Sequence, residues 1–177
     1  MSDLDQFRAA KDRWLATDPR SPLTADQRGD FGGLAYYEEA PGLVFVATPE
    51  VQDPVTLVEL ATSDGDVATY ERWARVSLTV DGEDVQLTVY RQPGAGSFFL
   101  PFVDASAGTE TYPAGRYLEV HELDEGRLLL DFNYAYNPYC AYNAGYSCAL
   151  PPAENRLPVA VRAGERAFEG DTVEHQH

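Results

Sequence analysis

The chain has 177 residues, with 29 acidic side chains against 13 basic ones and a formal net charge of −16. A charge of this sign argues against nucleic acid or an anionic membrane surface as a partner, because their phosphate groups would be repelled. No stretch approaches the roughly 18 consecutive apolar residues that a membrane-spanning helix needs. Residues 1–7 lack the basic region and apolar core of a signal peptide, which favours a cytoplasmic location.

The basic residues include a single lysine, Lys11. A GC-rich genome, which favours arginine codons, explains the missing lysines but not the excess of Asp and Glu. Self-repulsion destabilises a compact chain of this charge at low salt, and the Debye length shrinks to about 3 Å at 1 M salt. The composition therefore predicts a halophilic source.

The N-terminal pattern predicts an amphipathic helix over residues 3–16 that ends at Asp18-Pro19. The residues that repeat at helical spacing are Leu4, Phe7, Lys11, Trp14 and Leu15. Thr24 and Gln27 have the spacing of a capping box, which predicts a short helical turn after them.

Beyond Gly33 apolar residues alternate with period two, as is typical of strands. The segments with this pattern are 43–48, 55–60, 68–73, 75–80, 85–91, 97–100, 116–123, 127–133 and 157–161. Residues 81–84 (Asp-Gly-Glu-Asp) predict a hairpin turn between the fourth and fifth segments. About nine strands without interleaved helices favour an antiparallel β-barrel or sandwich. We therefore expect a mainly β chain forming one domain, 1–177, with a helical N-terminal cap at 3–33, a β core at 34–166, a long ordered loop near the C-terminus and a tail at 167–177.

The hairpin formed by 116–123 and 127–133 has a register that its own pattern predicts. A three-residue loop, 124–126, with Gly126 in the left-handed conformation places apolar residues opposite each other on one face. The expected apolar pairs are Val120 with Leu130 and Leu118 with Phe132, and the pairs on the other face are Tyr117 with Asn133, Glu119 with Asp131 and His121 with Leu129. A two-residue loop would instead place Val120 opposite Asp131.

The expected register sets the carboxylates of Glu119 and Asp131 directly opposite each other, which is unfavourable unless something compensates. An arginine, a cation, a shared proton or solvent would each compensate the repulsion between the two carboxylates. The face is either a solvated sheet surface of an acidic protein or the floor of a pocket whose wall is the following loop.

The loop at 131–156 is the most unusual segment of the chain. It holds Cys140, Cys148, three prolines and five tyrosines, namely Tyr134, Tyr136, Tyr139, Tyr142 and Tyr146. Such aromatic content predicts an ordered loop with at least three rings mostly buried, because disordered segments lack aromatics. The cysteines are interpreted as a disulfide or close thiol pair with Cα atoms within about 7 Å. Buried free thiols, a structural zinc completed by His121 and a carboxylate, and a catalytic cysteine with His121 as base remain alternatives.

Several ordered motifs resemble a known family. They are Ser21-Pro-Leu, Phe31-Gly-Gly-Leu-Ala-Tyr, residues 102–118, Asp131-Phe-Asn-Tyr-Ala-Tyr-Asn-Pro, Cys140-Ala-Tyr, Cys148-Ala-Leu-Pro-Pro, Glu154-Asn-Arg-Leu-Pro and Ala163-Gly-Glu. Nearly the whole chain resembles the prokaryotic family catalogued as domain of unknown function 1684. Ala149 stands where that family usually has proline, and Pro113 where it usually has a small residue. The resemblance implies no established activity, cofactor or catalytic residue.

Three functions are compatible with these observations. The first is a protein that binds a small molecule beside the 131–156 loop. Its expected ligand-binding residues are Arg116, Tyr117, Asp131, Asn133, Tyr136, Asn137, Glu154 and Asn155. The second is a hydrolase or lyase without a cofactor that uses Asp131 and Glu154 as general acid and base. The third is a structural protein that acts through a partner.

Cys140, Cys148 and His121 are weak candidates for metal ligands. No cofactor is expected, and the oligomeric state stays open.

Overall fold

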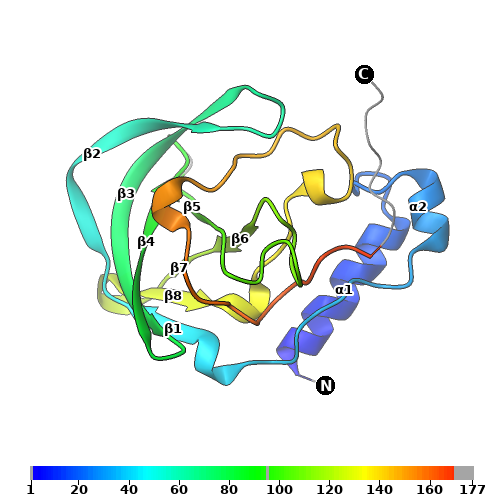
Figure 1. Cartoon of the computed structure of the whole chain (residues 1–177), viewed down its shortest axis with the longest axis horizontal. Helices are drawn as coiled ribbons and strands as arrows, with labels where there is room; N and C mark the ends of the chain where they lie inside the picture. Colours follow the sequence, from blue (N-terminus) through cyan, green and yellow to red (C-terminus); the bar gives the residue numbers. More distant parts are fainter. Residues whose placement is uncertain (1, 95, 170–177) are drawn as a thin grey trace.

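The computed structural model describes residues 2–94 and 96–169, and they form a mainly β structure with two antiparallel sheets (Figure 1). The larger sheet has the order β2-β3-β4-β5-β6, and the smaller one the order β1-β8-β7. The strands are β1 (Val44–Ala47), β2 (Glu50–Ala61), β3 (Val67–Val80), β4 (Glu83–Arg91), β5 (Phe98–Phe102), β6 (Arg116–Glu119), β7 (His121–Glu122) and β8 (Leu128–Asp131). The described residues thus contain eight strands instead of about nine.

Side chains from both sheets share one hydrophobic core. Fully buried members include Val76, Val89, Leu100, Phe102, Leu118, Leu128, Leu130 and Phe132. Within the described residues the two sheets are not hydrogen-bonded to each other, so the expected barrel is not closed and a sandwich fits.

Two helices lie at one side of the molecule, opposite the long strands β2, β3 and β4 (Figure 1). Helix α1 (Asp3–Thr17) ends at Asp18, as the following proline predicts. Helix α2 (Ala25–Asp30) begins with the predicted capping box of Thr24 and Gln27. No helix in the described part of the chain is both long and apolar enough to cross a membrane.

Two of the predicted strands are one continuous strand, β3, whose register shifts between Arg72 and Ala74. The turn at 81–84 is confirmed, with Asp81 and Gly82 both at positive φ. The predicted strand at 157–161 is wrong. Its backbone makes single hydrogen bonds to the 103–105 segment, and Pro158 has no N–H with which to continue a ladder.

The second hairpin has the predicted register near its turn. His121 pairs with Leu129, and Gly126 has a φ of 71°. Farther from the turn the predicted pairs are wrong, because the chain changes sheets at Val120. Glu119 pairs with Phe99 of β5. The remaining observed pairs are Leu118 with Leu100, Tyr117 with Pro101 and Asp131 with Val44 of β1.

The loop after β8 is described along its whole length. It contains three 3₁₀ turns, η3 (Phe132–Tyr134), η4 (Tyr139–Ala141) and η5 (Ala153–Asn155), besides η1 (Pro41–Leu43) and η2 (Asp124–Gly126) elsewhere. Tyr142 is fully buried, Tyr134 and Tyr136 are half-buried, and the other two tyrosines of the loop are exposed. A bridge between Thr62 and Ala149 fixes the loop to the β2–β3 end of the larger sheet. Of the expected tail at 167–177, residues 170–177 lie outside the described part.

Candidate functional site

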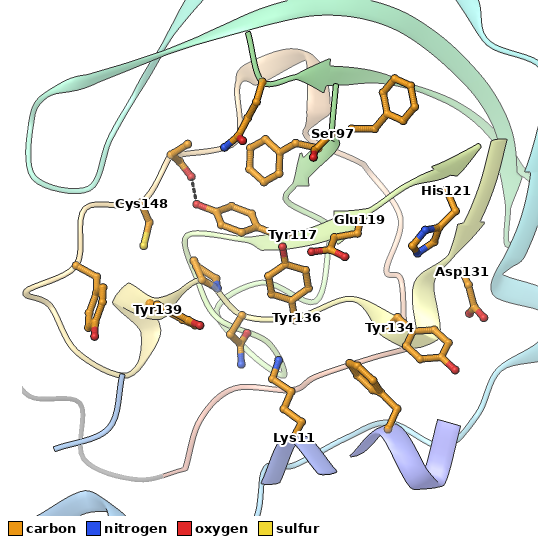
Figure 2. Close-up of a pocket in the computed structure, with 18 of the residues that line it drawn as sticks. Lys11, Ser97, Tyr117, Glu119, His121, Asp131, Tyr134, Tyr136, Tyr139 and Cys148 are labelled. Carbon is orange, nitrogen blue, oxygen red and sulfur yellow. Dashed lines mark hydrogen bonds between the residues drawn. The ribbon is translucent and has the colours of Figure 1, made fainter. Parts of the chain in front are cut away.

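A cavity of about 1160 Å³ opens between helix α1, both sheets and the 132–149 part of the loop (Figure 2). Helix α1 forms one side, strands β5 to β8 contribute the opposite side, and the loop closes a third. The cavity therefore lies where the sequence predicts it, beside the loop that follows Asp131.

Aromatic side chains form most of the wall. They are Phe7, Trp14, Tyr70, Phe98, Phe99, Tyr117, Tyr134, Tyr136, Tyr139 and Tyr146. The rings support one another in edge-to-face pairs, as between Phe99 and Tyr117 with centroids 4.7 Å apart, and between Tyr117 and Tyr136 at 5.8 Å. Such pairs fix ring positions, so the wall presents preformed π faces to a ligand.

Two tyrosines of the wall are held as neutral phenols. Burial is the largest cause that raises the pKa of Tyr117 and of Tyr136, and the neighbouring Glu119 raises that of Tyr136 further. The Tyr117 hydroxyl donates to the Ala149 carbonyl at 2.5 Å, which joins β6 to the loop. These groups act as rigid, uncharged surfaces at any physiological pH.

Two carboxylates, Glu119 and Asp131, line the same cavity together with His121 (Figure 2). Asp131 accepts hydrogen bonds from the backbone N–H and the side-chain amide of Asn133, both at 3.0 Å. In the part of the chain that the structure describes, neither carboxylate forms an ion pair with a basic side chain. The cavity thus carries negative charge that the described residues do not neutralise.

The single lysine, Lys11, also lines the cavity, and its ammonium group lies 5.1 Å from the centroid of the Tyr136 ring. It forms an ion pair with Glu165, which is only 2% exposed. Glu165 also accepts from the Asn137 backbone N–H at 3.0 Å and from the Tyr142 hydroxyl at 2.9 Å. The positive charge of Lys11 is therefore compensated within the protein.

Four of the residues predicted to bind a ligand line the cavity: Tyr117, Asp131, Tyr136 and Asn137. The side-chain oxygen of Asn137 is buried and accepts no hydrogen bond from the described residues. A buried amide oxygen without a donor costs about 1–3 kcal/mol of folding free energy.

Arg116 lies elsewhere, fully buried in the core. Its guanidinium donates to the carbonyls of Ala163, Glu165 and Val161 at 2.6, 3.0 and 2.8 Å, and it pairs with Asp104 at 3.5 Å. The arginine therefore holds the C-terminal segment against the sheet.

The other three predicted ligand-binding residues also have partners within the fold. Asn133 binds both backbone groups of Ala40, and Asn155 binds both backbone groups of Thr88. Glu154 pairs with Arg72 at 2.7 Å and accepts from the Tyr90 hydroxyl. Glu154 is not among the residues lining the cavity, so the acid–base pair of Asp131 and Glu154 is not brought together there.

The two cysteines are free thiols in contact with each other. The Cys140 backbone N–H donates to the Cys148 sulfur at 3.3 Å, and Cys148 lines the cavity, whereas Cys140 is buried and is not among the lining residues. No group of three or more His, Cys, Asp or Glu side chains in residues 2–94 and 96–169 is arranged to hold a metal ion. The predicted close thiol pair is therefore what the structure contains.

Sequence reasoning missed the contributions of helix α1 and strand β5 to the cavity. Phe7, Lys11 and Trp14 were interpreted only as part of a helical stripe. One signal was present, because Lys11 is the single lysine of the chain and interrupts an apolar stripe. Charged residues at such positions need a partner, which here is Glu165.

Comparison with known proteins agrees with this architecture. A model of the family described as "Protein of unknown function (DUF1684)" matches residues 29–166. The chain is also similar to the solution NMR structure of an uncharacterised protein from Haloarcula marismortui. The two share 39% sequence identity, the match covers 92% of this chain and 91% of that one, and the TM-score is 0.71. No curated protein matches significantly.

Proposed function

The chain belongs to the DUF1684 family, and we propose that it binds a small organic cation, such as an ammonium compound, in the aromatic cavity. The observation that carries the proposal is the combination of Glu119 and Asp131, without a basic partner in the described residues, with walls built from aromatic rings.

The aromatic walls and the two carboxylates both favour a positively charged ligand. A cation over an aromatic face gains about 0.5–2 kcal/mol, depending on how far it is desolvated. Carboxylates add Coulomb attraction that grows as water is excluded.

An anionic ligand fits this cavity less well. Lys11 is the lysine at the wall, and its ion pair with Glu165 already compensates its charge. The net charge of −16 also repels anions over longer distances.

We place this binding in the cytoplasm of a cell that accumulates salt. Support comes from the acidic excess with one lysine and from the similarity to a Haloarcula protein. We also propose that the N-terminal cap, the β core and the tail form a single domain.

The test compares choline with its uncharged isostere 3,3-dimethylbutan-1-ol by isothermal titration calorimetry at about 2 M KCl, where the self-repulsion of the chain is screened. We expect choline to bind at least about tenfold more tightly than the isostere, which corresponds to about 1.4 kcal/mol. Equal affinity for the two, or no binding of either, would contradict the proposal.

A matched pair of variants assigns the effect to the cavity. Replacing both carboxylates, Glu119→Gln with Asp131→Asn, should abolish the preference for choline. The control replaces two exposed carboxylates on the larger sheet, Glu59→Gln with Glu83→Gln, and changes the net charge equally. The control should retain the preference. A loss in both variants would mean that overall charge attracts the ligand.

A further inference from the structure

We propose that the cation bound in the aromatic cavity carries an alkyl chain, and that this chain lies along an apolar surface beside the cavity. The surface is formed by Val44, Val46 and Leu129 and is called the aliphatic strip below. The inference rests on the proposed function, because it assigns the remainder of a ligand whose positive group binds at Glu119 and Asp131. The register of the smaller sheet and the exposure of the two valines support it.

The strand register places the valines on the face of the smaller sheet that carries the cavity side chains. Strands β1 and β8 lie side by side (Figure 1), with Val44 opposite Asp131 and Val46 opposite Leu129. Residues directly opposite each other in an antiparallel pair share one face, with Cβ atoms about 4.5–5.5 Å apart. Asp131 and Leu129 line the cavity, and the valines do not. The valines therefore continue the same face by one strand beyond the cavity.

The fold leaves both valines open to a ligand. Val44 is 40% exposed and Val46 is 53% exposed. Phe45, between them, points the other way and packs edge-on against the buried ring of Phe132, with centroids 5.9 Å apart. Strand β1 thus buries one side chain in the core and presents two aliphatic ones on the outer face, as alternation along a strand requires.

The position of Asp131 decides which kind of ligand this surface suits. Asp131 lies across the ladder from Val44 and two residues from Leu129 on β8. Adjacent strands are about 4.8 Å apart, so a cation held at Asp131 lies about one strand spacing from the valines. A ligand that occupies both places has a positive group at one end and an aliphatic chain attached to it.

A protein partner suits the aliphatic strip less well. A stable protein interface buries about 800 Å² on each partner, which three aliphatic side chains do not provide. A single alkyl chain is narrow enough to follow the strip from Asp131 to the edge of the sheet, because β1 is the outermost strand. We therefore commit to a free cation with one alkyl chain as the occupant.

The experiment measures the affinity of the wild-type chain for a series of alkyltrimethylammonium chlorides by isothermal titration calorimetry at about 2 M KCl. The series consists of the tetramethyl, butyl, hexyl and octyl compounds, at concentrations where they stay monomeric. The strip contacts one side of the chain, so we expect about half the effect of full burial, or about a twofold gain in affinity per methylene. The octyl compound should therefore bind about 16-fold more tightly than the butyl compound.

A matched pair of variants locates the chain. Val44→Thr with Val46→Thr keeps the β-branched shape that suits a strand and adds two hydroxyl groups to the strip. The ratio of octyl to butyl affinity should fall below about fourfold, and the affinity for tetramethylammonium should stay unchanged. The control, Val55→Thr with Val67→Thr, changes two exposed valines of the larger sheet that do not line the cavity. It should keep the wild-type ratio.

The outcomes separate this inference from the proposed function. If choline is preferred over its uncharged isostere but affinity does not rise with chain length in the wild-type chain, the aliphatic strip is refuted and the cation site stands. This result needs no variant, so it holds even if a variant fails to fold. An unchanged ratio in Val44→Thr with Val46→Thr would show that the chain lies elsewhere. If choline is not preferred, the proposed function fails, and the inference fails with it.

Discussion

Lys11 and Glu165, 154 positions apart in the sequence, form an ion pair that ties helix α1 to the segment after the long loop. Glu165 is almost fully buried, and the Asn137 backbone and the Tyr142 hydroxyl bind its other carboxylate oxygen. The only lysine of the chain therefore neutralises a buried carboxylate and at the same time completes one side of the cavity.

Replacing Lys11 with methionine should destabilise the fold by about 3 kcal/mol, because the buried carboxylate loses its cationic partner. The free energy of unfolding is measured by urea titration at about 2 M KCl. Arg13→Met is the matched control, since it removes one positive charge from an exposed position of the same helix. A loss of under about 1 kcal/mol in Lys11→Met would show that Glu165 does not depend on the lysine.

Arg116→Lys should cost at least about 3 kcal/mol in the same titration. An ammonium group lacks the planar fork that reaches three carbonyls and Asp104 at once, and each buried acceptor left without a donor costs about 1–3 kcal/mol. Arg162→Lys, which changes an exposed ion pair with Glu110, should cost less than about 1 kcal/mol. Equal losses in the two variants would argue against a structural role for Arg116.

The thermal midpoint should rise substantially when KCl is increased from about 0.1 M to about 2 M, because screening weakens repulsion within a chain of net charge −16. Differential scanning calorimetry measures the shift. A series with sodium chloride at matched ionic strength separates general screening from specific binding of potassium. An unchanged midpoint would contradict the interpretation of the composition as halophilic.

The ultraviolet absorbance of the Cys140 thiolate should appear with a midpoint below the ordinary cysteine pKa in the native chain, because the Cys148 thiol and the Tyr112 hydroxyl donate hydrogen bonds to the Cys140 sulfur and lower its pKa. Because the native pKa lies below the ordinary value of about 8.5, the stabilisation that accompanies this shift is complete above about pH 8.5 and is lost as the pH falls through the lowered native pKa. Cys140→Ser should lack the transition. Cys148→Ser should move it to higher pH, because the donor to Cys140 is changed. A wild-type midpoint at the ordinary value would contradict the hydrogen-bonded arrangement.

Local chemistry in the sequence was enough to determine the elements whose signals lie within a few residues. The end of α1 follows from Asp18-Pro19, and the start of α2 from the reciprocal hydrogen bonds of Thr24 and Gln27. The pairing of His121 with Leu129 follows from the turn at Gly126 and from the need to bury one face of the hairpin. In each case the interacting groups are close in sequence, so their spacing specifies the geometry.

Only the tertiary structure decided which partner a residue has when several are available. Glu119 pairs with Phe99 of β5 in the larger sheet, whereas Asp131 lies in the smaller sheet, because β5 offers a backbone ladder that the hairpin pattern does not reveal. Arg116 was predicted to bind a ligand, but carbonyls some 45 to 49 positions away surround it. The choice between binding a ligand and satisfying the fold depends on which buried acceptors lie within reach, and long-range packing determines those distances.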